Sequence, residues 1–146
     1  MKKLLLIAAS FVIGATAMAQ QKVDDVIKVK TEKIDFGKIK QNVPVTTYFE
    51  IKNISNKPVV IESATGSCGC TTPEVPKEPI APNATIKLKV NYNAAALNQF
   101  NKDVFVKVAG IQEPKNLKIT GEVLEPAAFA TYAKQKKTTV AKKAKS

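Results

Sequence analysis

The sequence predicts an all-β protein whose strands stack as two sheets. Apolar and polar residues alternate at the two-residue period of a strand in several separate segments. Asn, Gly and Pro residues typical of turns separate these segments, and there is no convincing helical period between residues 27 and 125. About seven short strands joined by spaced turns are typical of an immunoglobulin-like β-sandwich.

The first strands follow from this alternation. Residues 27–30 and residues 33–36 each alternate apolar with charged side chains. The odd positions of residues 45–51 are expected to face a core and the polar residues between them water, which places inside Val45, Thr47, Phe49 and Ile51. Residues 53–58 form a turn, and residues 59–61 start the strand that leads to Ser67.

The second half contains a proline-rich segment and three further strands. Four prolines in residues 71–83 prevent a regular ladder and predict a long ordered loop or edge crossing. The clearest alternation follows and puts four residues on one face: Ile86, Leu88, Val90 and Tyr92. The last two strands are marked by Val104, Val106 and Val108, and by Leu117, Ile119 and Val123.

Residues 1–19 are predicted to be a secretory signal peptide. Lys2 and Lys3 precede an apolar run over residues 4–13, and small residues follow up to Ala19, where cleavage is expected. The run is far shorter than the roughly 20 apolar residues that a membrane span needs. No cysteine follows the run directly, which argues against a lipid anchor. We therefore expect an exported protein, periplasmic or extracellular.

The mature chain is expected to hold one domain. Residues 20–26 are polar and predicted to be flexible, residues 27–125 form the sandwich, and residues 126–146 form an Ala- and Lys-rich tail predicted to be disordered. The signal peptide and tail carry most of the excess positive charge, since the remaining 15 of the 23 lysines face 12 acidic residues. Six tail lysines are candidates for weak contact with anionic lipid or glycan: Lys134, Lys136, Lys137, Lys142, Lys143 and Lys145.

Composition argues against several functional classes. The chain has no histidine, which removes Ser-His and Cys-His nucleophile pairs and the usual proton shuttle at neutral pH. The basic tail has no arginine and no interleaved aromatic residues, so specific nucleic-acid recognition is not expected. We therefore expect neither an enzyme nor a nucleic-acid reader, and no cofactor.

Cys68 and Cys70 are the only cysteines of the chain and the main candidates for chemistry, with Ser67, Gly69 and Thr71 as supporting residues. The switch from alternation to proline spacing places them in a loop at the end of a strand. In an oxidising compartment two thiols at this spacing can form a disulfide. Such a bridge closes a very small ring, which constrains the unfolded chain little. Gly69 is expected to supply backbone torsions that a side chain would oppose.

Three interpretations of this pair remain open. The first is a structural turn or bridge. The second is a redox-responsive disulfide, because strained bridges are easily reduced. The third is a metal site, in which Cys68 and Cys70 hold a soft ion such as Cu(I). A third soft ligand is missing from the mature chain, and zinc, which takes four ligands, is less favoured.

The order of several short motifs resembles a known family. The motifs are Phe36-Gly37-Lys38-Ile39, Ser67-Cys68-Gly69-Cys70-Thr71, Pro79-Ile80-Ala81-Pro82 and Leu117-Lys118-Ile119-Thr120-Gly121-Glu122-Val123. The chain resembles the exported bacterial proteins grouped as domain of unknown function 1573. The resemblance implies an immunoglobulin-like sandwich, related in architecture to periplasmic chaperone and sperm-protein-like β domains, and no function. Asn42 and Asn83 stand where the family commonly has glycine, and asparagine tolerates positive φ better than most residues.

The expected function is a non-enzymatic binding or interaction module of the cell envelope. Such domains present loops or a sheet edge to a protein or envelope partner. The alternative is a thiol-disulfide or Cu(I)-handling protein that uses Cys68 and Cys70.

Overall fold

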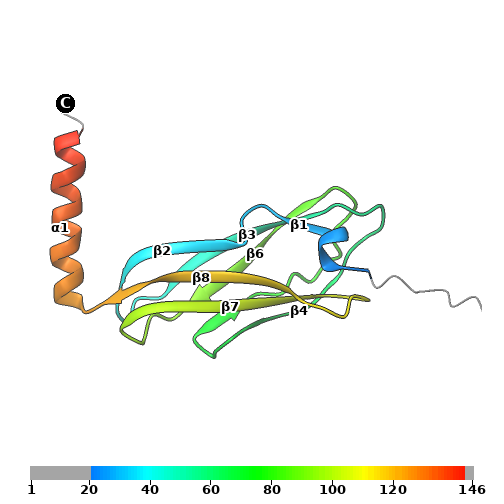
Figure 1. The fold of residues 1–146 in the computed structure, drawn as a ribbon, viewed down its shortest axis with the longest axis horizontal. Coiled ribbons are helices and arrows are strands. Elements are labelled where there is room, and N and C mark those ends of the chain that lie inside the picture. Colours follow the sequence, from blue (N-terminus) through cyan, green and yellow to red (C-terminus); the bar gives the residue numbers. More distant parts are fainter. Residues whose placement is uncertain (1–20, 144–146) are drawn as a thin grey trace, which may run out of the picture.

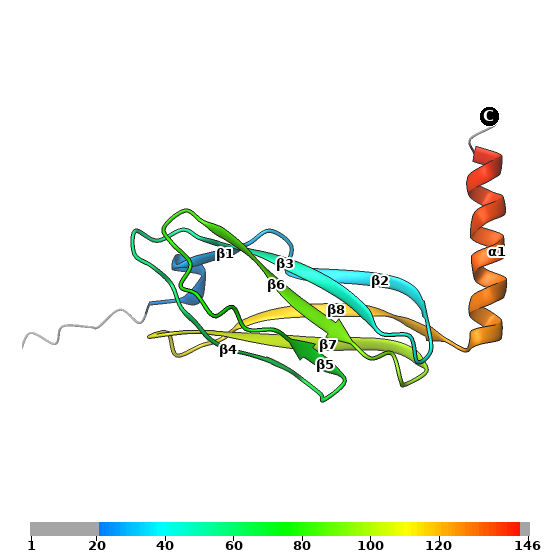
Figure 2. The ribbon, with the colours of Figure 1, turned by 180° about the vertical axis from the view of Figure 1, so that it is seen from behind.

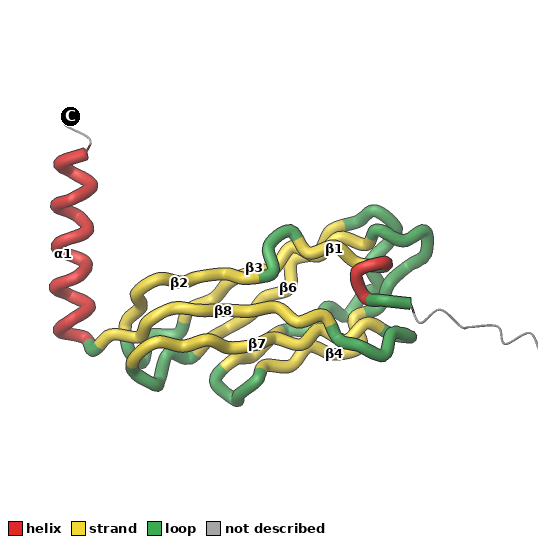
Figure 3. Tube along the Cα trace, viewed as in Figure 1, coloured by secondary structure: helices red, strands yellow, loops and turns green. Residues whose placement is uncertain are grey.

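Two stacked β-sheets followed by a helix make up the chain in the computed structural model, which describes residues 21–143 and their side chains up to residue 137 (Figures 1 and 3). The elements are η1 (Val23–Asp25), β1 (Ile27–Val29), β2 (Lys33–Lys40), β3 (Val45–Asn53), β4 (Ile61–Gly66), β5 (Thr71–Pro73), β6 (Thr85–Tyr92), β7 (Asn98–Val108), β8 (Lys115–Leu124) and α1 (Pro126–Lys143). The signal peptide predicted for residues 1–19 lies outside the described residues.

The two sheets have four strands each. One sheet has the order β1-β3-β6-β5 and the other β2-β8-β7-β4. Neighbouring strands are antiparallel except β2 and β8, which are parallel. The predicted sandwich is confirmed, with one strand more than expected. That strand is β5, which pairs with β6 only over Thr71–Pro73 before the proline-rich segment ends the ladder.

The core between the sheets contains the residues that alternation predicts. Phe49, Leu88, Val90 and Tyr92 from one sheet are at most 1% exposed. From the facing sheet, Val104, Val106, Leu117 and Ile119 are completely buried. The period of two therefore identified the inner face of each long strand correctly.

The start of the chain crosses from one sheet to the other between β1 and β2. The backbone N–H of Lys30 still donates to the Glu50 carbonyl of β3, at 3.1 Å. Two residues later, the Glu32 carbonyl accepts from the N–H of Lys118 in β8, at 2.8 Å. The crossing ends the pairing of β1 with β3 at Val29 and leaves β2 as an edge strand.

The prediction of a flexible segment over residues 20–26 is wrong from Val23 onward. Val23 and Val26 are buried, and η1 lies between them. Lys115, only 8% exposed, reaches both Asp24 and Glu32 at 2.6 Å. Burial alone would lower the pKa of Lys115, but the hydrogen bonds to Asp24 and Glu32 outweigh this effect and raise the pKa overall. Lys115 therefore remains a cation. The sequence missed this anchor because Lys115 is far along the chain.

Two turns confirm the role expected of asparagine. Asn42 and Asn83 have positive φ angles of 59° and 62°. Asparagine is one of the residues that adopt this left-handed conformation at modest cost. Both turns therefore form with asparagine at these positions.

The prediction of a disordered tail is also wrong over Pro126–Lys143, which form α1, while residues 144–146 lie outside the described residues. Alanine and lysine favour helices intrinsically, so little burial is needed. At its start, Phe129 and Tyr132 pair at 6.2 Å, and Lys38 of β2 lies 5.3 Å from the Tyr132 ring centre. The rest of α1 stands away from the sandwich (Figures 1 and 2). No helix among residues 21–143 is long and apolar enough to span a bilayer.

Candidate functional site

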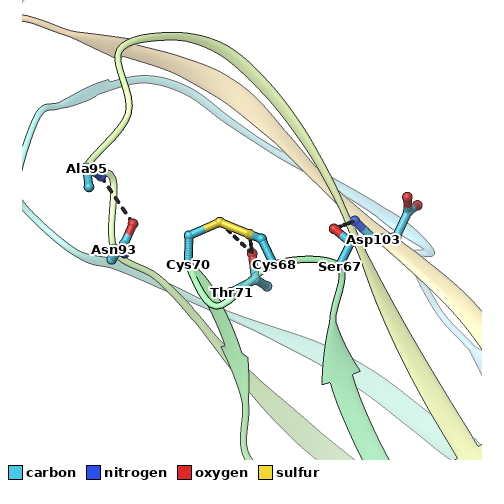
Figure 4. Close-up of a disulfide and its surroundings, with 7 residues drawn as sticks. All are labelled: Ser67, Cys68, Cys70, Thr71, Asn93, Ala95 and Asp103. Carbon is cyan, nitrogen blue, oxygen red and sulfur yellow. Dashed lines mark hydrogen bonds between the residues drawn. A yellow bond between two sulfur atoms is a disulfide. The ribbon is translucent and has the colours of Figure 1, made fainter.

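Cys68 and Cys70 lie in the short loop that carries the chain from β4 in one sheet to β5 in the other, as predicted for a strand end (Figure 4). They form a disulfide with Cα atoms 5.2 Å apart. Both residues are half-buried, and Cys70 packs against the core. The outer side of the bridge is thus accessible while its inner side rests on the sandwich.

Thr71 contacts both sulfurs of the bridge on its buried side. Its hydroxyl oxygen is 3.6 Å from the Cys68 sulfur and 3.9 Å from the Cys70 sulfur. Its backbone N–H donates to the Cys68 carbonyl at 3.1 Å, closing a turn. Thr71 is only 4% exposed, so the motif threonine belongs to the floor of the loop rather than to its surface.

Neighbouring strands fix both ends of the loop. Ser67 exchanges two hydrogen bonds with Asp103 of β7: its N–H donates to the Asp103 carbonyl at 2.9 Å, and its hydroxyl accepts from the Asp103 N–H at 3.1 Å. At the other end, the Asn93 N–H donates to the Cys70 carbonyl at 3.0 Å. Sequence reasoning found Ser67 but not Asp103 or Asn93, which have no signal local to the motif.

The titratable groups beside the loop are poor candidates for activating a thiol. A hydrogen bond from Lys118, at 2.6 Å, holds the pKa of Asp103 below its ordinary value. Burial raises the pKa of Tyr92, which pairs with Thr71 across the β5–β6 ladder. Asp103 is therefore a carboxylate and Tyr92 a neutral phenol near pH 7, and neither is tuned to act as a general base there.

The glycine that shapes the loop is Gly66, which corrects the role expected for Gly69. A Cβ at Gly69 would meet no heavy atom within 4 Å, and Gly69 is absent from the glycines with positive φ. A Cβ at Gly66 would lie 2.3 Å from the Thr71 carbonyl oxygen. The close approach of two backbone segments, rather than unusual torsions between the cysteines, is what requires glycine here.

The metal interpretation gains little support from the ligand set. Among residues 21–143, no three His, Cys, Asp or Glu side chains gather closely enough to hold an ion. Both methionines belong to residues 1–20, which are not described. In the disulfide form, moreover, neither sulfur is a thiolate, which is the form that binds metals.

The tail lysines form a separate candidate surface. Three of these lysines are exposed on α1: Lys134, Lys136 and Lys137. The helix contacts β2 and β8, and not the cysteine loop. Lys142 and Lys143 belong to the same helix, but their side chains are not described. Lys145 lies outside the described residues. The structure therefore does not join the cysteines and the tail lysines into one site.

Replacing both cysteines with serine should leave the domain folded, with a change in unfolding free energy of about 1 kcal/mol or less. The ring is so small that the bridge restricts the unfolded chain little, and the backbone hydrogen bonds of Ser67 and Cys70 do not need it. Urea denaturation of the double variant, compared with the oxidised parent protein, measures this. Loss of a cooperative transition would show that the bridge is essential to the fold.

Comparisons with known proteins agree with this architecture. A family model described as "Protein of unknown function (DUF1573)" matches residues 27–123. No protein of curated function matches the chain significantly.

Several solved structures share the fold at low sequence identity. A Porphyromonas gingivalis W83 protein of unknown function superposes with a TM-score of 0.56 at 16% identity, over 66% of this chain and 46% of that one. The PapD-like domain 7 of human CEP192 superposes with a TM-score of 0.58 at 8% identity, over 83% and 99% of the two chains. The Vibrio cholerae VesB protease gives 0.52 at 13% identity, over 68% and 32%. The chain thus spans about half of the P. gingivalis protein, and these likenesses show the fold alone.

Proposed function

Because the chain belongs to the DUF1573 family of proteins of unknown function, we propose a function from its own geometry: an exported, non-enzymatic interaction module of the bacterial cell envelope. One observation carries the proposal, namely the half-exposed loop of residues 67–70, which is held by a disulfide and by backbone hydrogen bonds at both ends. A loop that is already held in one conformation loses little conformational entropy when it binds. The partner is a protein or another envelope component.

Export agrees with the chemistry of this loop. Disulfides persist in the periplasm and outside the cell, where the signal peptide proposed for residues 1–19 would direct the chain. The loop also lacks a tuned acid or base, as the pKa directions of Asp103 and Tyr92 indicate. This second point favours binding over catalysis. The likeness to a protease carries no weight here, because at 13% identity it concerns the fold alone.

Blocking the loop without unfolding the protein tests the proposal. Gly69→Arg puts a long side chain where the structure leaves open space, and Asn56→Arg, in an exposed turn between β3 and β4, is the matched control. Cross-linked partners captured from envelope extracts are compared by mass spectrometry, and melting curves verify folding. A partner retained by wild type and Asn56→Arg but lost by Gly69→Arg supports the loop. Identical partner sets for all three proteins contradict it.

The half-exposed disulfide favours one alternative, thiol-disulfide exchange. A thiolate of a partner dithiol would attack one sulfur, giving a mixed disulfide and releasing the other cysteine as a thiol. The second partner thiol would then resolve it, so that the partner is oxidised and Cys68 and Cys70 are reduced by two electrons and two protons. If the protein handles Cu(I) instead, the thiolates of the reduced Cys68 and Cys70 are the groups that would bind the ion. A reduction midpoint near that of the surrounding thiol pool supports exchange, and one far below it contradicts exchange.

The helix α1 carries a second proposed contact, with anionic lipid or glycan. It projects from the sandwich (Figure 2). Its Lys134, Lys136 and Lys137 are exposed. Clustered lysines bind polyanions by releasing counterions, without specific recognition of bases. This contact would be weak and would decrease as salt rises.

Truncation after Glu125 should preserve the fold and abolish this contact. Tyr132 of the helix lies beneath the ammonium group of Lys38 in β2, and an exposed cation–π contact of this kind is worth about 1 kcal/mol at most. Thermal unfolding should therefore change little, while sedimentation with vesicles of an anionic phospholipid should be lost. Binding that survives truncation, or that is indifferent to salt, would place the contact on the sandwich.

A further inference from the structure

A shallow hollow lies where the chain crosses from one sheet to the other. It has a volume of about 240 Å³ and is lined by Lys30, Thr31, Ile34, Tyr48, Glu50 and Lys87. The crossing creates it: β1 pairs with β3 only over Ile51–Asn53, so the remainder of that edge of β3 is not covered by a strand. None of the residues of the cysteine loop contributes to it.

The charges in the hollow do not balance. Lys30 pairs with Glu50 at 3.0 Å, and this hydrogen bond is the main reason why the pKa of Glu50 is lowered, so Glu50 is ionised. Lys87 lies opposite Glu50 on β6. Of the ion pairs found among the described residues, none includes Lys87. Two ammonium groups and one carboxylate leave one positive charge for a ligand.

The hollow also has a flat aromatic wall. Tyr48 is 52% exposed, although its neighbour Phe49 is buried in the core. Ile34 of β2 adds an aliphatic wall, and Thr31 lies on the rim with an exposed hydroxyl-bearing side chain. An exposed aromatic ring beside charged and hydroxyl groups suits a ligand with an apolar ring face and a polar perimeter.

Further lysines extend the positive charge along the same sheet. Lys28 of β1 lies directly opposite Lys52 of β3. Like charges placed directly opposite each other destabilise a sheet. Neither lysine belongs to an ion pair within the described part of the chain. The face around the hollow therefore keeps an unfavourable cluster that an anionic ligand would relieve.

We infer that the hollow binds one unit of an acidic polysaccharide, a sugar ring that carries a carboxylate. The ring face packs on Tyr48, the carboxylate pairs with Lys87, and ring hydroxyls donate to Glu50. Lys28 and Lys52 meet the carboxylates of adjoining units. Lysine, a point charge without the planar fork of arginine, suits such loosely oriented anions. The exposed ring of Tyr48 favours a sugar over an acidic peptide side chain, which offers no ring face to pack on it.

Titration calorimetry of the full chain with tetragalacturonic acid tests this inference, which goes beyond the proposed function and uses a different surface. The methyl ester of the same tetramer is the neutral control ligand, and poly-glutamate is the acidic peptide. Lys87→Gln and Tyr48→Ala remove the two main contacts. Lys40→Gln removes a charge that is also exposed, from β2 in the other sheet. A triple variant with Lys134→Gln, Lys136→Gln and Lys137→Gln, called the helix variant, tests whether α1 binds the ligand instead.

The expected result is that the acid binds and its ester does not. Lys87→Gln should weaken binding by about tenfold or more, the loss expected for one charged hydrogen bond, and Tyr48→Ala by up to about tenfold through loss of the ring contact. Lys40→Gln, the helix variant and Gly69→Arg should change it less than about twofold by the same conversion. The inference is overturned if the wild type does not bind, if Lys40→Gln or the helix variant weakens binding equally, or if poly-glutamate binds better through Lys87. None of these results bears on the cysteine loop.

Discussion

Phe49→Ala should lower the free energy of unfolding by about 3–5 kcal/mol, the largest single effect expected for a side chain of this protein. Phe49 is 1% exposed and lies opposite Leu88, which is completely buried, across the β3–β6 ladder. Alanine would leave a cavity that the rigid strands on both sides fill only partly. Since small domains have a total stability of only about 5–15 kcal/mol, the variant should unfold at much lower urea concentration.

Tyr48→Ala is the matched control for this prediction. It truncates an aromatic residue of the same strand, one position earlier, whose side chain points to solvent and is 52% exposed. Its free energy of unfolding, measured by urea denaturation, should change by less than about 1 kcal/mol, as for most surface substitutions. Equal midpoints for Phe49→Ala and the parent protein would mean that β3 has the opposite face inward.

Gly66→Ala should cost about 1–3 kcal/mol and displace the cysteine loop. The added Cβ would lie 2.3 Å from the Thr71 carbonyl oxygen and 2.8 Å from its Cβ. Neither atom is at the end of a flexible side chain, so the backbone must move. Because Thr71 also supports both sulfurs, the movement should disturb the bridge, and loss of partner capture is expected together with loss of stability.

Gly69→Ala distinguishes this steric cause from a general need for glycine in the motif. Nothing lies within 4 Å of the position that its Cβ would take. Its unfolding free energy should stay within about 0.5 kcal/mol of that of the parent. If Gly69→Ala proves the more destabilising of the two, the torsional role first expected for Gly69 is restored and the role of Gly66 is wrong.

Much of the fold could be predicted because strand periodicity is a local property. Side chains on a strand point alternately to its two faces, so Leu88 and Val104 could be assigned to the core before any partner strand was known. The φ angles of Asn42 and Asn83 followed in the same way from the intrinsic tolerance of asparagine. The errors arose where a distant contact or a weak local preference decided the structure. Lys115 orders the segment around Asp24, and helix propensity orders α1.

The candidate site shows the same division. The spacing of Cys68 and Cys70 and the onset of prolines placed the pair at a strand end. The hydrogen bonds to Asp103 and Asn93 that hold the loop join residues more than 20 positions apart, and no motif marks them. Sequence could name the chemical groups of the loop but not the neighbours that make it rigid.

By itself, the sequence determined every strand segment except β5, which face of the long strands is apolar, and that two thiols are close enough to bridge. Only the tertiary structure decided that β1 and β2 belong to different sheets and that Tyr48, Lys30 and Lys87 line one hollow. The physical reason is that strands pair through backbone N–H and C=O groups, which every residue type except proline carries alike. Side-chain patterns therefore specify the faces of a strand, whereas its neighbours are selected by packing of the whole chain.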